Sequence, residues 1–176
     1  YKEGSAIYDI YGHTGDSSSD AYTISTAQQL LSFAYEVNEG GWDFEGKYVK
    51  LDAGLTLQSS LSIKPEDSGV VSWIGIGTYA TPFNGSFLGY SRKINCLYGK
   101  PLFIATGEKA FIEYTSLNNV LGISGGGAVV ETNGGILGAC IIEGDIVGTE
   151  PYCGSITAHH LATGYILSCV HIGTAE

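Results

Sequence analysis

The chain repeats itself in its C-terminal part, and this repeat limits the possible folds more than any other feature of the sequence. Residues 135–146 align without gaps on residues 164–175, which places Cys140 on Cys169 at an offset of 29. A weaker copy at residues 111–120 lies 25 residues before the first. Units of this length, made of short strands and Gly-rich corners, are typical of one turn of a parallel β-solenoid. Equivalent strands then stack about 4.8 Å apart, so that like residues form ladders.

The offset between the two main copies changes at one turn. Upstream of that turn, residues 127–129 match residues 154–156 at an offset of 27, so the second copy has a turn longer by two residues, at 159–163. Insertions in solenoids tend to lie on one exposed face, which is often the binding face. We therefore expect His159 and His160 to lie in an exposed turn, where they are candidate ligand contacts.

One segment near the N-terminus has helical periodicity. Residues 25–28 match a capping box, in which the Ser25 hydroxyl accepts a hydrogen bond from a free backbone amide and Gln28 reaches back. The apolar residues that follow at helical spacing are Ala27, Leu30, Leu31, Ala34 and Val37. Because open β-coils have exposed edges that invite aggregation, an end has to be covered. We expect a helix within residues 25–40 to cap the N-terminal end.

Length and composition agree with one all-β domain, a parallel β-solenoid with an N-terminal capping helix. The 176 residues suit a single domain, with a strand and loop segment at 1–24, the cap at 25–40 and β-helix coils at 41–176. The 26 Gly and 4 Pro predict many tight corners between short buried strands. The chain stops inside its last repeat and contains no Met. We expect that the native protein continues or, alternatively, that a partner chain covers the C-terminal end.

Charge argues against several classes of partner. The chain has 18 acidic and 8 basic residues, a net charge of −10, and no basic residue follows Lys109. This balance disfavours nucleic acids and anionic membranes. The sequence contains no run of 18 consecutive apolar residues, so it predicts no transmembrane helix. The cysteines lack C-x-x-C spacing, so we expect no zinc site and no cofactor.

Several segments resemble a bacterial protein family. Residues 23–34, 37–38 and 44–51, followed by 82–89 and the two repeats, resemble the corresponding parts of Bacteroidetes-like cell-surface proteins with GLUG-motif repeats. The resemblance implies a right-handed parallel β-helix in a secreted or surface-exposed, adhesin-like protein, and it implies no catalytic activity. The namesake Gly-Leu-x-Gly is Gly-Ala-Val-Val at 127–130, so the copies are degenerate.

Motifs with catalytic or metal-binding spacing are better explained as turns. Residues 122–126 match the nucleophile elbow G-x-S-x-G, but no helix is expected after Ser124. Residues 16–20 resemble half a calcium loop but lack its Gly and terminal Glu. Adjacent strand residues such as His159 and His160 point to opposite faces, so they rarely share a metal ion.

The stacked pair Cys140 and Cys169 offers either a disulfide or two thiols. Stacked strands hold Cβ atoms about 4.8 Å apart, beyond the roughly 3.5–4.5 Å that a disulfide uses. A buried thiol ladder is the favoured interpretation, since free Cys behaves as a small hydrophobe.

Tyrosines are the remaining candidates for binding. Tyr79 and Tyr90 lie in loops or at strand ends, where an apolar ring face and a polar tip suit a sugar. Alternatively, the rings cover hydrophobic edges of the coil. We expect a non-enzymatic, extracellular or cell-surface adhesin-like module that binds a glycan or a host protein through Tyr79, Tyr90, His159 and His160. The alternatives are a fragment of a carbohydrate-active β-helix enzyme, either lyase or glycosidase, and a purely structural stalk.

Overall fold

The computed structural model describes residues 13–51, 73–95, 97, 99–118, 120, 123, 126–144, 146 and 154–174. The predicted elbow serine Ser124 lies outside these residues. No helix in the described part of the chain is long and apolar enough to cross a membrane.

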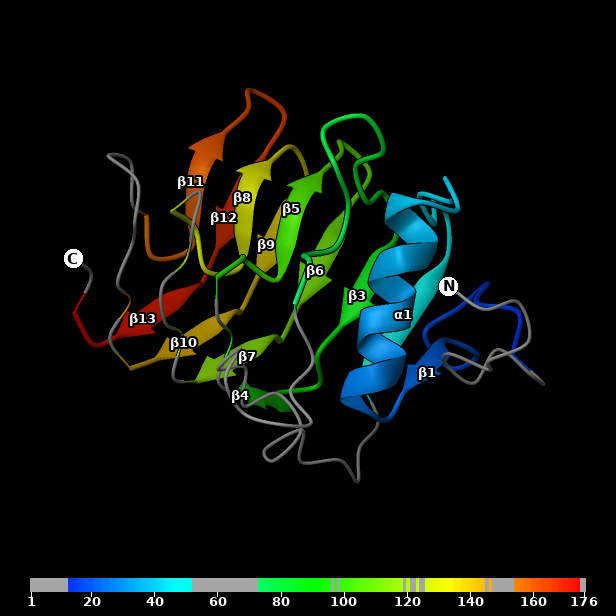
Figure 1. Cartoon of the computed structure of the whole chain (residues 1–176), viewed down its shortest axis with the longest axis horizontal. Coiled ribbons are helices and arrows are strands. Elements are labelled where there is room, and N and C mark those ends of the chain that lie inside the picture. Colours follow the sequence, from blue (N-terminus) through cyan, green and yellow to red (C-terminus); the bar gives the residue numbers. More distant parts are fainter. Residues whose placement is uncertain are drawn as a thin grey trace.

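The chain winds as a parallel β-solenoid with three sheets around one core (Figure 1). The six-stranded sheet has the order β1 (Tyr22–Ile24), β2 (Tyr48–Leu51), β3 (Ser86–Leu88), β6 (Phe111–Glu113), β9 (Ile136–Gly138) and β12 (Tyr165–Leu167). The four-stranded sheet contains β4 (Lys93–Asn95), β7 (Ser116–Asn118), β10 (Ile141–Glu143) and β13 (Val170–Ile172). The three-stranded sheet contains β5 (Phe103–Thr106), β8 (Val130–Asn133) and β11 (Thr157–His160). Each strand therefore pairs with its equivalent in the next coil, as predicted.

Strand register confirms the internal repeat. Leu137 pairs with Ile166 at the offset of 29, and Ile112 pairs with Leu137 at the offset of 25. Gly127 and Gly154 form a parallel bridge at the offset of 27. The extra two residues of the last coil consequently lie in the turn between β11 and β12, as predicted, but this turn begins after His160. His159 and His160, which we expected in the turn, are instead the last residues of β11 and pair in register with Thr132 and Asn133.

The core consists of ladders of apolar side chains. Side chains alternate between the two faces of a strand, so every second residue of the six-stranded sheet points inward. The inward ladder of fully buried residues is Val49, Phe87, Ile112 and Leu137. Because neighbouring coils repeat the same inward position, each apolar side chain is covered by its equivalents above and below.

Helix α1 (Ala27–Asn38) confirms the predicted helix, but its cap is shifted by one residue. Thr26, not Ser25, is the N-cap: its backbone is still extended and its side chain accepts from the Gln29 amide at 3.0 Å. The Gln29 Oε1 atom accepts from the Ser25 amide at 2.6 Å, which is the role predicted for Gln28. The reciprocal pattern of a capping box is kept, one position later in the chain.

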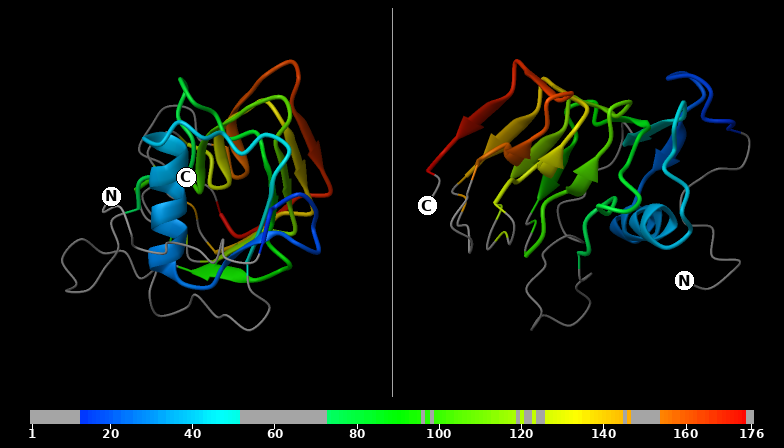
Figure 2. Two further views of the ribbon diagram at one scale, coloured as in Figure 1. Left: turned by 90° about the vertical axis from the view of Figure 1, so that its right-hand side faces the viewer. Right: turned by 90° about the horizontal axis from the view of Figure 1, so that it is seen from above.

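Helix α1 lies at the N-terminal end of the solenoid, as predicted, where it forms one side of the first coils and packs its buried face on the core (Figure 2). Phe33 has its ring centroid 4.8 Å from that of Phe44 and 5.8 Å from that of Phe83. The Asn38 side chain donates to the Gly75 carbonyl at 2.9 Å. Phe33 replaces Leu31 as a central member of the buried stripe, since Leu31 is only partly buried.

Candidate functional site

Tyr79 stands on a loop beside the three-stranded sheet. Ile76 and Phe83 each form a bridge to β5, at Phe103 and Thr106, so the residues between them are held at both ends. The Tyr79 side chain is 67% exposed. An aromatic ring is thereby presented to solvent from a loop whose two ends are anchored in the sheet.

The Tyr79 hydroxyl reaches across to strand β8. The Tyr79 hydroxyl donates to the Glu131 carboxylate, and the Thr132 hydroxyl also forms a hydrogen bond to the Tyr79 hydroxyl. The hydrogen bond to Glu131, and then burial, raises the pKa of Tyr79 above its ordinary value. The phenol therefore stays protonated, with its hydroxyl directed at the sheet and its ring accessible.

His159 lies beside this contact. It is the register partner of Thr132 in the pairing of β11 with β8, and it is exposed. The structure thus brings two of the four predicted contact residues into one region of the three-stranded sheet. We call Tyr79, Glu131, Thr132 and His159 the Tyr79 patch.

His160 has a different environment from its neighbour. Its Nδ1 atom lies 3.5 Å from Nδ2 of Asn133, which is fully buried at the equivalent position one coil earlier. Asn133 in turn accepts from the Thr106 hydroxyl at 2.8 Å. His160 therefore continues a ladder of polar residues at the end of these strands, and its own side chain is exposed.

Tyr90 lies at a separate corner, between β3 of the six-stranded sheet and β4 of the four-stranded sheet. Its backbone has φ +49°, and Tyr114, Ala139 and Ser168 follow the equivalent strands of later coils with φ between +49° and +54°. This left-handed conformation turns the chain from one sheet to the next at every coil. Tyr90 is exposed, but the structure does not bring it to the Tyr79 patch.

The six-stranded sheet carries a row of outward-facing residues that was not predicted from the sequence. Its members are paired in register across adjacent coils: Tyr48, Ser86, Phe111, Ile136 and Tyr165. Each directly precedes a residue of the inward ladder, so it points to the opposite face. The signal was present in the sequence as an aromatic or aliphatic residue before every core residue of this ladder except Phe87, which Ser86 precedes, but its meaning depends on knowing the register.

The predicted half calcium loop is a hydrogen-bonded turn. Asp20 accepts from the Thr14 amide at 2.9 Å and from the Thr14 hydroxyl at 2.7 Å, and His13 lies 2.9 Å from its second oxygen. The Thr14 contacts, and then the His13 contact, lower the pKa of Asp20 to about 2. Asp16 pairs with Lys47 at 2.7 Å. In the described part of the chain, no three His, Cys, Asp or Glu side chains are grouped to hold a metal ion.

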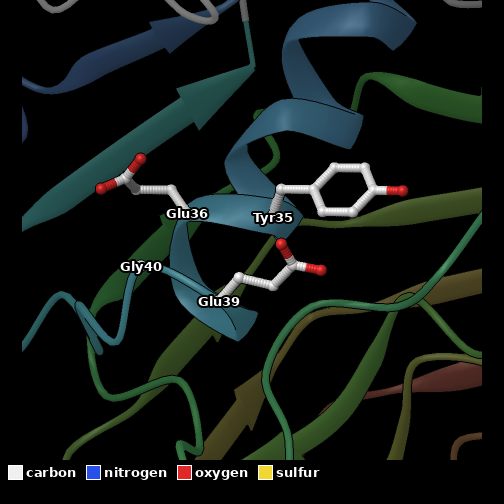
Figure 3. A pocket seen from close by; sticks show the side chains of 4 residues that line it. All are labelled: Tyr35, Glu36, Glu39 and Gly40. Carbon is white, nitrogen blue, oxygen red and sulfur yellow. The ribbon is translucent and has the colours of Figure 1, made fainter. Parts of the chain in front are cut away.

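The described residues form a hollow of about 280 Å³ at the C-terminal end of α1. Tyr35, Glu36, Glu39 and Gly40 line it (Figure 3). The Tyr35 and Glu39 side chains extend to one side of the helix, whereas Glu36 extends to the other (Figure 3). The two carboxylates do not converge, so this hollow lacks the facing acid and base that a glycosidase uses.

Cys140 and Cys169 are free thiols at equivalent positions of neighbouring coils, as the ladder interpretation predicted. Cys140 is buried, while Cys169 in the last coil is only partly covered. A hydrogen bond from the Cys140 thiol lowers the pKa of Cys169, while the pKa of Cys140 is raised by its contact with Cys169 and by burial. Cys169 is therefore the thiol of the pair that ionises first.

Comparison with known proteins returned no relative: no family model, no curated protein and no solved structure matches the chain.

Proposed function

We propose that this chain is a non-enzymatic, adhesin-like module that binds a glycan through the Tyr79 patch. The observation that carries the proposal is the exposed Tyr79 ring, whose hydroxyl is held by Glu131 and Thr132 beside His159. The resemblance to GLUG-motif repeat proteins supports a bacterial, secreted or cell-surface setting for such a module.

The chemistry of the patch suits a neutral sugar. The ring supplies an apolar face for a pyranose, and the Glu131 carboxylate, the Thr132 hydroxyl and the His159 imidazole supply acceptors and donors for its hydroxyl groups. The net charge of −10 disfavours anionic polysaccharides at long range. The patch contains a single carboxylate, whereas glycoside hydrolysis usually needs two. Binding without turnover is therefore the better proposal.

A glycan array probed with the purified chain, followed by titration calorimetry on the best sugar, tests this proposal. We expect selective binding of neutral glycans, lost in Tyr79→Ala and weakened in His159→Ala. Tyr79→Phe keeps the ring and loses the hydroxyl, so it separates stacking from hydrogen bonding. Tyr114→Ala is the matched control, because Tyr114 is an exposed tyrosine at the corner between the other two sheets.

Two results would contradict the proposal. A blank array would remove the glycan and favour a host or partner protein as the ligand. Binding that survives Tyr79→Ala and His159→Ala would place the site elsewhere, with the outward row at Phe111 and Ile136 as the next surface to test.

A further inference from the structure

Cys140 and Cys169 stand at the same corner of two successive coils. Each directly precedes a strand of the four-stranded sheet, and the residues that follow them, Ile141 and Val170, are register partners. The Val170 amide donates to the Cys140 carbonyl at 2.9 Å, so the backbones of the two cysteines lie side by side. Neighbouring strands are about 4.8 Å apart. The spacing of the two α-carbons is therefore within the roughly 4.4–6.8 Å that a disulfide spans.

The two sulfur atoms point into the corner in the same way. The Cys140 thiol donates to the Gly138 carbonyl at 3.6 Å, and the Cys169 thiol donates to the equivalent Leu167 carbonyl, also at 3.6 Å. Cys169 reaches back one coil as well, with its Sγ atom 3.6 Å from the Leu137 oxygen. The two thiols form a hydrogen bond with each other. The sulfur atoms are therefore in direct contact.

Closing a bond between them requires only a small movement. The Cβ spacing of stacked strands, about 4.8 Å, exceeds the upper end of the disulfide range, about 4.5 Å, by a few tenths of an ångström. Both cysteines follow a residue in the left-handed conformation, Ala139 with φ +49° and Ser168 with φ +54°, so they lie where the chain changes direction. The same position one coil earlier holds the buried Thr115. The bond is thus confined to Cys140 and Cys169 on this ladder.

We propose that Cys140 and Cys169 are a redox-active pair, which a small disulfide oxidant such as oxidised glutathione converts into a disulfide between their two coils. Cys169 attacks one sulfur of the oxidant as its thiolate, so a mixed disulfide forms, the sulfur–sulfur bond of the oxidant breaks and one thiolate leaves. Cys140 then gives up its proton and attacks the Cys169 sulfur, which releases the second thiolate. The pair loses two electrons, and its two protons end on the two thiols released.

The environment of the pair favours this order of attack. Cys169 is the thiol with the lowered pKa, because it accepts a hydrogen bond from Cys140. The contact with Cys169 is also the largest cause of the raised pKa of Cys140, followed by burial. Once Cys169 is in the mixed disulfide, that contact no longer holds the proton on Cys140, and its sulfur is already beside the bond it has to attack.

The disulfide would clamp one whole coil of the solenoid. The two cysteines are 29 residues apart, and strands β10, β11 and β12 lie between them. A covalent link over a loop of this length restricts the unfolded chain and so stabilises the folded one. Disulfides persist in oxidising compartments and are reduced in the cytosol. The pair therefore makes the stability of this coil depend on the redox environment.

Incubation of the 176-residue chain in glutathione buffers of graded composition, followed by acid quenching and peptide mass mapping, tests the proposal. We expect a linked peptide pair that contains Cys140 and Cys169, and a midpoint of thermal unfolding about 5 °C or more above that of the reduced chain. Cys169→Ser should lose both effects. Cys96→Ser with Cys153→Ser removes the other two cysteines, which lie outside the described residues, and should keep both effects.

Three results would overturn the proposal. The first is a wild-type chain that stays reduced in the most oxidising buffer. The second is a linkage that joins Cys140 or Cys169 to Cys96, to Cys153 or to another molecule instead. The third is a bridged chain that unfolds at the same temperature as the reduced chain or at a lower one. Glycan binding by the Cys169→Ser variant measures the Tyr79 patch separately, so the failure of either proposal leaves the other standing.

Discussion

The two ends of the described solenoid differ in how far the apolar core is covered. At the N-terminal end, helix α1 covers the first coils with an aromatic cluster in which Phe33, Phe44, Phe83 and Phe87 are fully buried. At the C-terminal end, Ile166 has the same inward position as Leu137 and stays partly exposed. The difference shows that a coil is stabilised by the neighbour that covers it, because repeat proteins gain stability at the interfaces between units. An apolar residue at the right register position stabilises little until another element covers it.

The largest expected effect on stability is at the N-terminal cap. Phe33→Ala removes a fully buried ring that contacts Phe44 and Phe83, so we expect a loss of about 3–5 kcal/mol in the free energy of unfolding. Chemical denaturation followed by circular dichroism measures it. Tyr79→Ala is the control, as an exposed aromatic truncation of comparable size. Equal losses in the two variants would show that α1 is not a stabilising cap.

Truncation within a single ladder compares the two ends directly. Leu137→Ala leaves a cavity between two covering coils and should cost about 2–5 kcal/mol. Ile166→Ala, one coil later, should cost less than half as much in the dilute monomer, because its side chain already contacts water. Denaturation curves for both variants at the same low protein concentration decide this. Equal costs would mean that the last coil is already covered.

The helix cap allows a finer test of the N-terminal end. Thr26→Ala removes the acceptor for the Gln29 amide and should destabilise the chain by about 1 kcal/mol. Thr26→Ser keeps a hydroxyl and should recover most of the loss. Thermal unfolding of the two variants measures the effect, and a Thr26→Ser variant as unstable as Thr26→Ala would indicate that packing of the Thr26 methyl group matters instead.

The smallest expected effect is a pH dependence confined to the N-terminal end. The pKa of Asp20 is lowered from 3.8 to about 2 in the folded chain, so its hydrogen bonds favour the ionised carboxylate. Their contribution is present above pH 3.8 and is lost as pH falls from there toward 2. Thermal unfolding of wild type and Asp20→Asn between those values should converge as Asp20 becomes protonated. The described residues 154–174 contain no carboxylate, so the last coil should show no such titration. A wild-type chain that differs from Asp20→Asn by the same amount at both pH limits would contradict this role.

Much of the fold could be predicted because its signals are local or periodic. The offsets of 25, 27 and 29 residues specify which strands pair, and the observed pairs Ile112–Leu137 and Leu137–Ile166 follow from them. The candidate site was predicted less well. Tyr79 meets β8 through a contact over 52 residues of sequence, which no local pattern encodes. His159 and His160 are adjacent in sequence and both exposed, yet only the structure shows that His159 pairs with Thr132 of the Tyr79 patch and that His160 follows the buried Asn133.

The sequence by itself determined the solenoid, the position of its longer turn and the presence of one amphipathic helix, because repetition and periodicity depend on residues near each other in the chain. Only the tertiary structure decided which residues share a surface. In the folded coil, the loop that carries Tyr79 contacts β8, whereas Tyr90 lies at another corner. Ile166 has the same inward position as Leu137 but stays partly exposed. The physical reason is that exposure and contact depend on what packs against a residue in three dimensions, and the same ladder position is buried in one coil and open in the next.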